Sequence, residues 1–224
     1  MTVSAISAIR LSLLVAFLGA ALGLPIAIVL GHTLARLRGP LRTLLSSIVL
    51  MPLVLPPVVT GFLLLALLGR RGLLGAALEA IGVVIPFSLA GAVIAGLAVG
   101  LPLYVMAARA AFEAVDPRHE ELARTLGLTR WQAFRRVSLP LARSGLAAGA
   151  VLAFARALGE FGATAVLAGD VEGRTRTLAL AVYALLETPG GEPLAWTLSG
   201  VSVVLSVLAL GTHEWLAHRA RSDG

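Results

Sequence analysis

Long apolar runs without an ionised side chain constrain this chain more than any other feature of its sequence. Five runs that are almost free of charge cover residues 11–31, 44–68, 87–108, 144–168 and 194–213. Only the fourth contains charged residues, Arg156 and Glu160. About 20 apolar residues in a helix are needed to span the hydrocarbon core of a bilayer. We therefore predict an all-α polytopic membrane protein, a single domain over residues 1–224 with five spanning helices. Segments 72–86 and 177–186 are also apolar but short, and either could add a sixth, short or re-entrant segment.

The composition excludes several classes of protein. Charged residues make up 13% of the chain, about half the share found in soluble domains, which excludes an ordinary soluble enzyme or a disordered chain. All 18 basic residues are arginine. Without lysine the chain cannot form the GxxxxGK[ST] loop that contacts nucleotide phosphates, and without cysteine it has no thiol chemistry or cysteine-based metal site. We predict no catalytic residue, no metal site and no bound cofactor.

The arginines predict which loops face the cytoplasm, because cytoplasmic loops carry an excess of basic residues. With five spans, twelve arginines fall on one side: Arg36, Arg38, Arg42, Arg109, Arg118, Arg124, Arg130, Arg135, Arg136, Arg143, Arg219 and Arg221. Five fall on the other side: Arg10, Arg70, Arg71, Arg174 and Arg176. We expect a multi-pass protein of the cell membrane, with loop 109–143 and the C-terminus in the cytoplasm and the N-terminus outside.

A proline run interrupts the second apolar stretch. Pro52, Pro56 and Pro57 lack a backbone donor and bend or break a helix. Irregular backbone at membrane depth is tolerated only where it is buried in protein or lines a cavity. Pro56, Pro57 and the nearby Thr60 are therefore candidates either for a simple kink or for the lining of a transport path. Pairs of glycines at GxxxG spacing predict close packing of helices; these are Gly19/Gly23, Gly96/Gly100 and Gly145/Gly149.

The charges inside the fourth predicted span need partners. On one helix Arg156 and Glu160 would lie one turn apart on the same face. Pairing would reduce the cost of about 2.5–3.5 kcal/mol that each would carry at the bilayer centre. Two interpretations stay open. Either the pair is a structural lock between helices or at a dimer seam, or Arg156 supplies positive potential along the path of a dianion and Glu160 tunes it.

The loop over residues 115–142 carries the strongest local folding signals. Asp116 and Pro117 predict a helix start, with a capping carboxylate followed by proline in the first turn. That helix would run to Leu126, and Gly127 suits the left-handed position that follows a helix. A compact turn between two short helices is the expected result.

The second helix of this loop is predicted from a capping box. Thr129 and Gln132 have the required spacing, and the helix should end before Pro140 because a residue that precedes proline disfavours the α conformation. The pair of helices carries more apolar surface than it can bury, in Leu122, Leu126, Trp131 and Phe134. Such a surface is typical of a docking site for another protein.

The same loop resembles the EAA loop in the membrane subunits of ATP-binding-cassette (ABC) importers. The spacing Glu-x-Ala-x3-Gly-x9-φ-x-Leu-Pro, where φ is an apolar residue, is met by Glu121, Ala123, Gly127, Val137, Leu139 and Pro140. Leu122 departs from the usual alanine, and Val137 stands where isoleucine is frequent. The resemblance implies a loop that docks on an ATPase, to which we assign Glu121, Leu122, Ala123, Gly127, Trp131, Phe134, Leu139 and Pro140. Stretches 55–75, 154–169 and 173–192 resemble the molybdate-transport permeases in particular.

The resemblance implies a permease that moves molybdate, or tungstate, to the cytoplasm by alternating access. The implied partners are a second copy of the chain, two ATPase subunits that bind ATP and Mg²⁺, and an extracytoplasmic binding protein, with no role for nucleic acid. A permease for sulfate or another oxyanion is the alternative, because part of stretch 154–169 is shared with sulfate permeases. A secondary transporter without an ATPase is a further alternative, but it would need several ion-coordinating groups in the spans and usually internal repeats.

Overall fold

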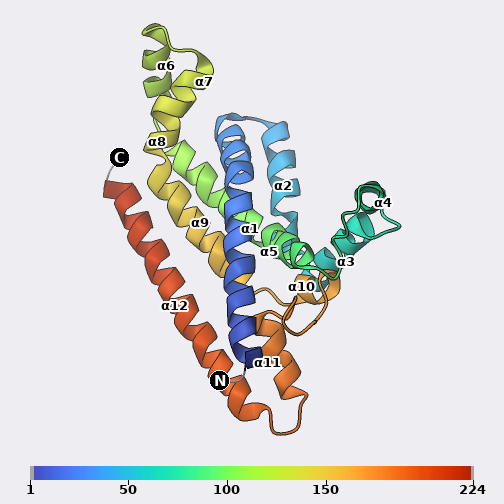
Figure 1. Ribbon diagram of the computed structural model, residues 1–224. Helices are drawn as coiled ribbons and strands as arrows, with labels where there is room; N and C mark the ends of the chain where they lie inside the picture. The colour runs from blue at the N-terminus through green and yellow to red at the C-terminus, as the bar shows by residue number, and fades with distance from the viewer. Residues whose placement is uncertain (1–2, 223–224) are drawn as a thin grey trace.

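The computed structural model describes residues 3–222, with side chains for residues 4–219, so Arg221 lies outside the described side chains. Within residues 3–222 the fold is helical, with no strand (Figure 1). Three helices are long and apolar enough to cross a membrane: α1 (Val3–Arg36), α5 (Leu89–Glu113) and α12 (Glu192–Ser222). Two sharply bent helix pairs raise this number to five if each pair is one span.

The first bent pair joins α2 (Pro40–Val54) and α3 (Pro57–Leu68) at an angle of 111°. Leu55 is extended, with φ −67° and ψ 142°, because the residue before a proline is forced out of the α region. Pro56 then caps α3 and Pro57 occupies its first turn, where the missing N–H costs nothing. Pro52 lies inside α2 without ending it. The proline run therefore produces a break between two helices.

The second bent pair consists of the helical stretch Arg130–Leu141 and α9 (Arg143–Leu158), which meet at 68°. The short α10 (Gly162–Leu167) follows α9 after a break of three residues. Segment 72–86 contains α4 (Leu73–Ala80), and segment 177–186 contains α11 (Leu178–Leu186). At 1.5 Å per residue α11 is about 13 Å long, too short to span a bilayer.

Small residues bring the long helices into close contact. A Cβ on Gly100 of α5 would lie 2.9 Å from the carbonyl oxygen of Ala153 in α9, and one on Gly149 would lie 2.8 Å from Cβ of Ala107. Gly19 of α1 would meet the backbone of α5 at 3.4 Å. The close helix packing predicted from the GxxxG pairs is confirmed.

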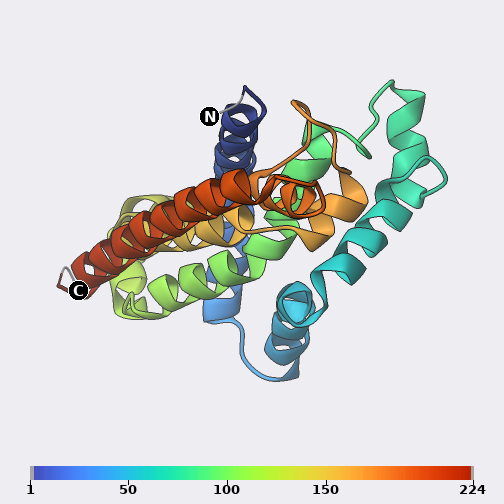
Figure 2. The same cartoon turned by 90° about the horizontal axis from the view of Figure 1, so that it is seen from below.

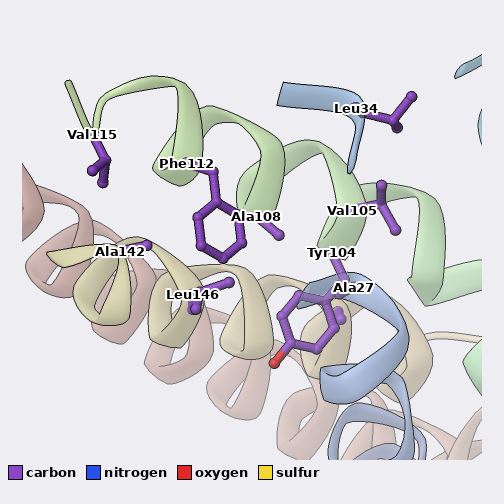
Figure 3. Packing of buried hydrophobic residues seen from close by; sticks show 10 residues of the cluster. Ala27, Leu34, Tyr104, Val105, Ala108, Phe112, Val115, Ala142 and Leu146 are labelled. Atoms are coloured by element: carbon purple, nitrogen blue, oxygen red, sulfur yellow. The ribbon is translucent and has the colours of Figure 1, made fainter. Parts of the chain in front are cut away.

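The main core lies where α1, α5 and α9 converge. Tyr104 and Phe112 of α5 are its largest fully buried side chains. Figure 3 shows Tyr104 beside Ala27 of α1 and Phe112 beside Leu146 of α9. Helices α2, α3 and α4 form an arm along one side of this bundle, and α12 lies along the other side (Figure 2). The arm and α12 turn many large apolar side chains outward, as expected for helices whose solvent is lipid.

Candidate functional site

Local capping builds the two helices of the loop as predicted. The Asp116 carboxylate accepts a hydrogen bond of 2.9 Å from the Arg118 N–H at the start of α6 (Pro117–Thr125). Thr129 and Gln132 form a complete capping box at the start of α7 (Arg130–Ala133), with each side chain bonded to the other residue's backbone N–H. These bonds satisfy helix-end donors that would otherwise lack partners. The capped helices project from one end of the bundle (Figure 1).

Gly127 makes the turn between these helices possible. Its φ is +89°, a region that L side chains rarely adopt. The N–H of Gly127 bonds to the carbonyl of Arg124, and the N–H of Leu128 bonds to that of Ala123. These bonds satisfy carbonyls at the end of α6. The predicted left-handed position is confirmed, and α6 ends at Thr125 with Leu126 as its cap.

The predicted end of the second helix is wrong. The chain continues from α7 through a π-helical turn, η1 (Phe134–Ser138), into α8 (Leu139–Leu141), which contains Pro140. The Leu139 N–H bonds to the carbonyl of Phe134, five residues back. In a regular α-helix the ring of Pro140 would collide with the carbonyl four residues before it. The wider π turn relieves that clash and lets the helical path continue.

Three large apolar side chains of the loop are exposed. Leu122, Leu126 and Trp131 are 64%, 76% and 63% exposed, although each would gain about 1.5–3 kcal/mol from full burial. Glu121 is also exposed. The guanidinium of Arg135 lies 5.8 Å from the centre of the Trp131 ring, so basic charge borders the patch. Exposed apolar side chains bordered by charge are typical of surfaces on which protein partners dock.

The remaining residues assigned to docking face inward or lie at the base of the loop. Ala123 is buried. Phe134 stacks on Trp131 at 5.5 Å between ring centres and lies 4.8 Å from the ring of His32 in α1. Leu139 packs against the main core, while Pro140 is exposed beyond the π turn. Of the residues assigned to docking, Glu121, Leu122 and Trp131 are therefore exposed, whereas Ala123, Phe134 and Leu139 pack inward.

The sequence analysis missed one polar contact that joins the loop to α1. Nη2 of Arg36, the last residue of α1, lies 3.3 Å from Oε1 of Glu120 in α6. The hydroxyl of Ser138 in η1 donates to the same oxygen. The carboxylate stands directly before the motif glutamate, but 84 residues separate it from Arg36, so no local pattern indicates the pair.

The two helix breaks inside the apolar region lie against each other. A Cβ on Gly162, the first residue of α10, would lie 3.0 Å from Cβ of Pro57, the first residue of α3. A Cβ on Gly61 would lie 2.7 Å from Cα of Ala163. Beside this contact Thr60 is 5% exposed, and its hydroxyl has no hydrogen-bond partner among the described residues. The junction of α3 and α10 therefore brings together irregular backbone and a buried hydroxyl group.

Arg156 and Glu160 do form an ion pair, with 2.9 Å between Nη1 and Oε2. The prediction that both lie on one helix is wrong, because α9 ends at Leu158 and Glu160 lies in the break before α10. There its second oxygen accepts a 2.8 Å bond from the Ala163 N–H, which satisfies a donor of α10. The Glu160 side chain is 2% exposed and that of Arg156 is 29% exposed. The glutamate thus stabilises the break, and the arginine reaches the surface of the chain.

Comparison with known proteins places this architecture among transport proteins. Residues 23–222 match the family described as the binding-protein-dependent transport system inner membrane component. The molybdenum transport system permease protein ModB of Escherichia coli is 46% identical over 96% of this chain and 94% of its own length. The ModB protein of Haemophilus influenzae is 42% identical over the same shares.

Solved structures of ABC transporters share the fold. A chain of a bacterial ABC transporter for the polysaccharide alginate superposes with a TM-score of 0.71, at 20% identity over 99% of this chain and 80% of that one. A chain of the MetNI methionine ABC transporter, in an inward-facing conformation, gives a TM-score of 0.63 at 18% identity over 99% and 94%.

Proposed function

Because this chain belongs to the family of binding-protein-dependent transport system inner membrane components, we propose that it is the permease subunit of an ATP-driven importer of molybdate, with tungstate as a second cargo. The assignment of the substrate rests on the 46% identity to a molybdenum permease over 96% of the chain. The chain is a transport subunit and not an enzyme. ATP hydrolysis belongs to a separate ATPase subunit.

The surface of Leu122, Leu126 and Trp131 is the ATPase contact in this proposal. It is apolar, exposed and held in shape by two capped helices, and it contains the glutamate of the EAA-like motif. The loop then lies in the cytoplasm with the C-terminus, and the N-terminus lies outside. Figure 1 supports this arrangement, since α6 and the C-terminus lie towards one end of the molecule and the N-terminus towards the other.

Two copies of the chain, two ATPase subunits and an extracytoplasmic binding protein complete the assembly. ATP and Mg²⁺ bind to the ATPase, and no cofactor is required on this chain. Closure of the ATPase pair pushes on α6, and the helices move between outward-open and inward-open arrangements. The energy for this shift comes from the difference in ATPase contacts between the two states.

The junction of α3 and α10 is the best candidate for the anion path. Irregular backbone at membrane depth survives where it is buried or lines a cavity, and the junction contains Pro56, Pro57 and the unpartnered hydroxyl of Thr60. The exposed part of Arg156 supplies positive charge beside it, while Glu160 holds the guanidinium in place. An arginine in this position lowers the cost of moving a dianion through apolar surroundings.

Reconstitution tests the proposal directly. Purified permease, its ATPase and the binding protein are placed in liposomes, and uptake of molybdate is measured with ATP inside, beside parallel vesicles with sulfate. We expect uptake that requires ATP and the binding protein and that excess sulfate does not suppress. Sulfate uptake equal to molybdate uptake would overturn the assignment of molybdate as the substrate. Uptake without the ATPase would overturn the ATP-driven importer mechanism.

A further inference from the structure

A single carboxylate oxygen joins α6 and η1, which carry residues of the EAA-like motif, to the end of α1. Oε1 of Glu120 in α6 lies 3.3 Å from Nη2 of Arg36 at the end of α1. The hydroxyl of Ser138, the last residue of η1, donates to the same oxygen. Ser138 is fully buried, and the side chains of Glu120 and Arg36 are about one quarter exposed. The contact is therefore partly shielded from water.

Helix α6 has little else to hold it to the bundle. Ala123 is its only buried residue, and α6 packs chiefly on α7 and η1. Leu122 of α6 and the cap residue Leu126 are exposed. Glu120 and Ala123 are three residues apart and so share one face of the helix. This inner face combines one small apolar contact with one charged contact.

We propose that Glu120 is a positioning residue that transmits force from the coupling helix to α1. This inference rests on the proposed function, in which an ATPase pushes on α6. Helices α5 and α9 receive that push through the chain itself, because they flank the loop. Helix α1 does not flank the loop, and its polar link to α6 is the Glu120–Arg36 pair. Without this link α6 turns under load, and part of each stroke is lost.

The geometry explains why Oε1 of Glu120 can contact both α1 and η1. Arg36 ends α1, where a basic side chain interacts favourably with the helix dipole, and its Nε is buried without a partner among the described residues. Glu120 is thus the carboxylate that orients this guanidinium. Ser138 reaches the same oxygen from the π turn. Glu120 therefore fixes the positions of both η1 and α1 relative to α6.

Distance measurement tests the link without any transport assay. The chain contains no cysteine, so spin labels are introduced at Arg118→Cys on α6 and Arg38→Cys just after α1, both at exposed positions. In the purified complex with its ATPase, Glu120→Gln should broaden or shift the distance distribution. The control is Glu113→Gln, which removes the ion pairs of Glu113 with Arg42 of α2 and with Arg109 of α5 and changes no contact of α6. An unchanged distribution in Glu120→Gln would overturn the proposal.

The transport readout separates positioning from general stability. In proteoliposomes, Glu120→Gln should keep its ATPase bound and active but import about two- to fivefold less molybdate per ATP, the range that a partly exposed ion pair supports. Arg36→Gln should have the same effect, and the double variant should be no worse than either single variant. Additive losses, or an unchanged ratio, would contradict the link. If the parent complex imports no molybdate, the proposed function fails, while the spin-label distances still decide the role of Glu120.

Discussion

Replacing Gly127 with valine should weaken binding of the ATPase by straining the turn that orients α6 relative to α7. Gly127 connects α6 to α7 with φ +89°, which β-branched residues rarely adopt. A Cβ here would meet no atom within 4 Å, so the cost is backbone strain alone, about 1–3 kcal/mol. Relief of this strain reorients α6 relative to α7 and separates Leu122 from Trp131.

The size of the effect follows if docking requires the strained turn to be restored. A cost of about 1–3 kcal/mol corresponds to a loss of affinity of about 5- to 150-fold. Titration of the purified ATPase against permease in nanodiscs measures the Kd directly. Gly127→Asn is the matched control, because asparagine tolerates positive φ, and it should bind within a few-fold of the parent. A valine variant that binds as tightly as the parent would refute the role of this turn.

Three other substitutions test separate parts of the account. Glu160→Ala leaves its arginine partner uncompensated and should lower the free energy of unfolding by about 1–3 kcal/mol; an unchanged thermal midpoint in detergent would show that the pair is dispensable. Gly100→Val forces α5 away from the carbonyl of Ala153 and should cost about 1–3 kcal/mol, whereas Gly200→Ala, which lies inside α12 and meets no atom within 4 Å, should leave stability unchanged or raise it by up to about 1 kcal/mol; equal midpoints for the two would contradict the packing. Leu126→Asp places a charge on the exposed apolar patch and should weaken ATPase binding about tenfold, and an unaltered Kd would remove this residue from the contact surface.

The helix starts in the loop, and the turn between its two helices, could be predicted because their causes are local. The capping bonds of Asp116 and Thr129 join residues two or three positions apart, and the turn at Gly127 depends on one backbone angle. Sequence spacing contains all of this information. The same holds for the break at Pro56, where the backbone restriction is set by the proline ring.

The features that sequence analysis missed depend on tertiary contacts or on backbone adjustments that residue spacing does not determine. The helical path continues through Pro140 because a π turn widens the backbone, and no residue type demands such a turn. Glu160 leaves the helix of Arg156 because it caps α10, a role that is visible only once α9 is known to end at Leu158. Pairing of Arg36 with Glu120 depends on how α1 meets the loop.

Accessibility of the loop tests the central claim most directly, since the account requires residues 116–140 to face the cytoplasm and to contact the ATPase there. The cysteine-free chain allows a single label site at Leu126→Cys, at the exposed end of α6. A membrane-impermeant thiol reagent should label it in inverted vesicles but not in intact spheroplasts, and added ATPase should protect it. Labelling from outside the cell, or labelling that the ATPase leaves unchanged, would contradict the account.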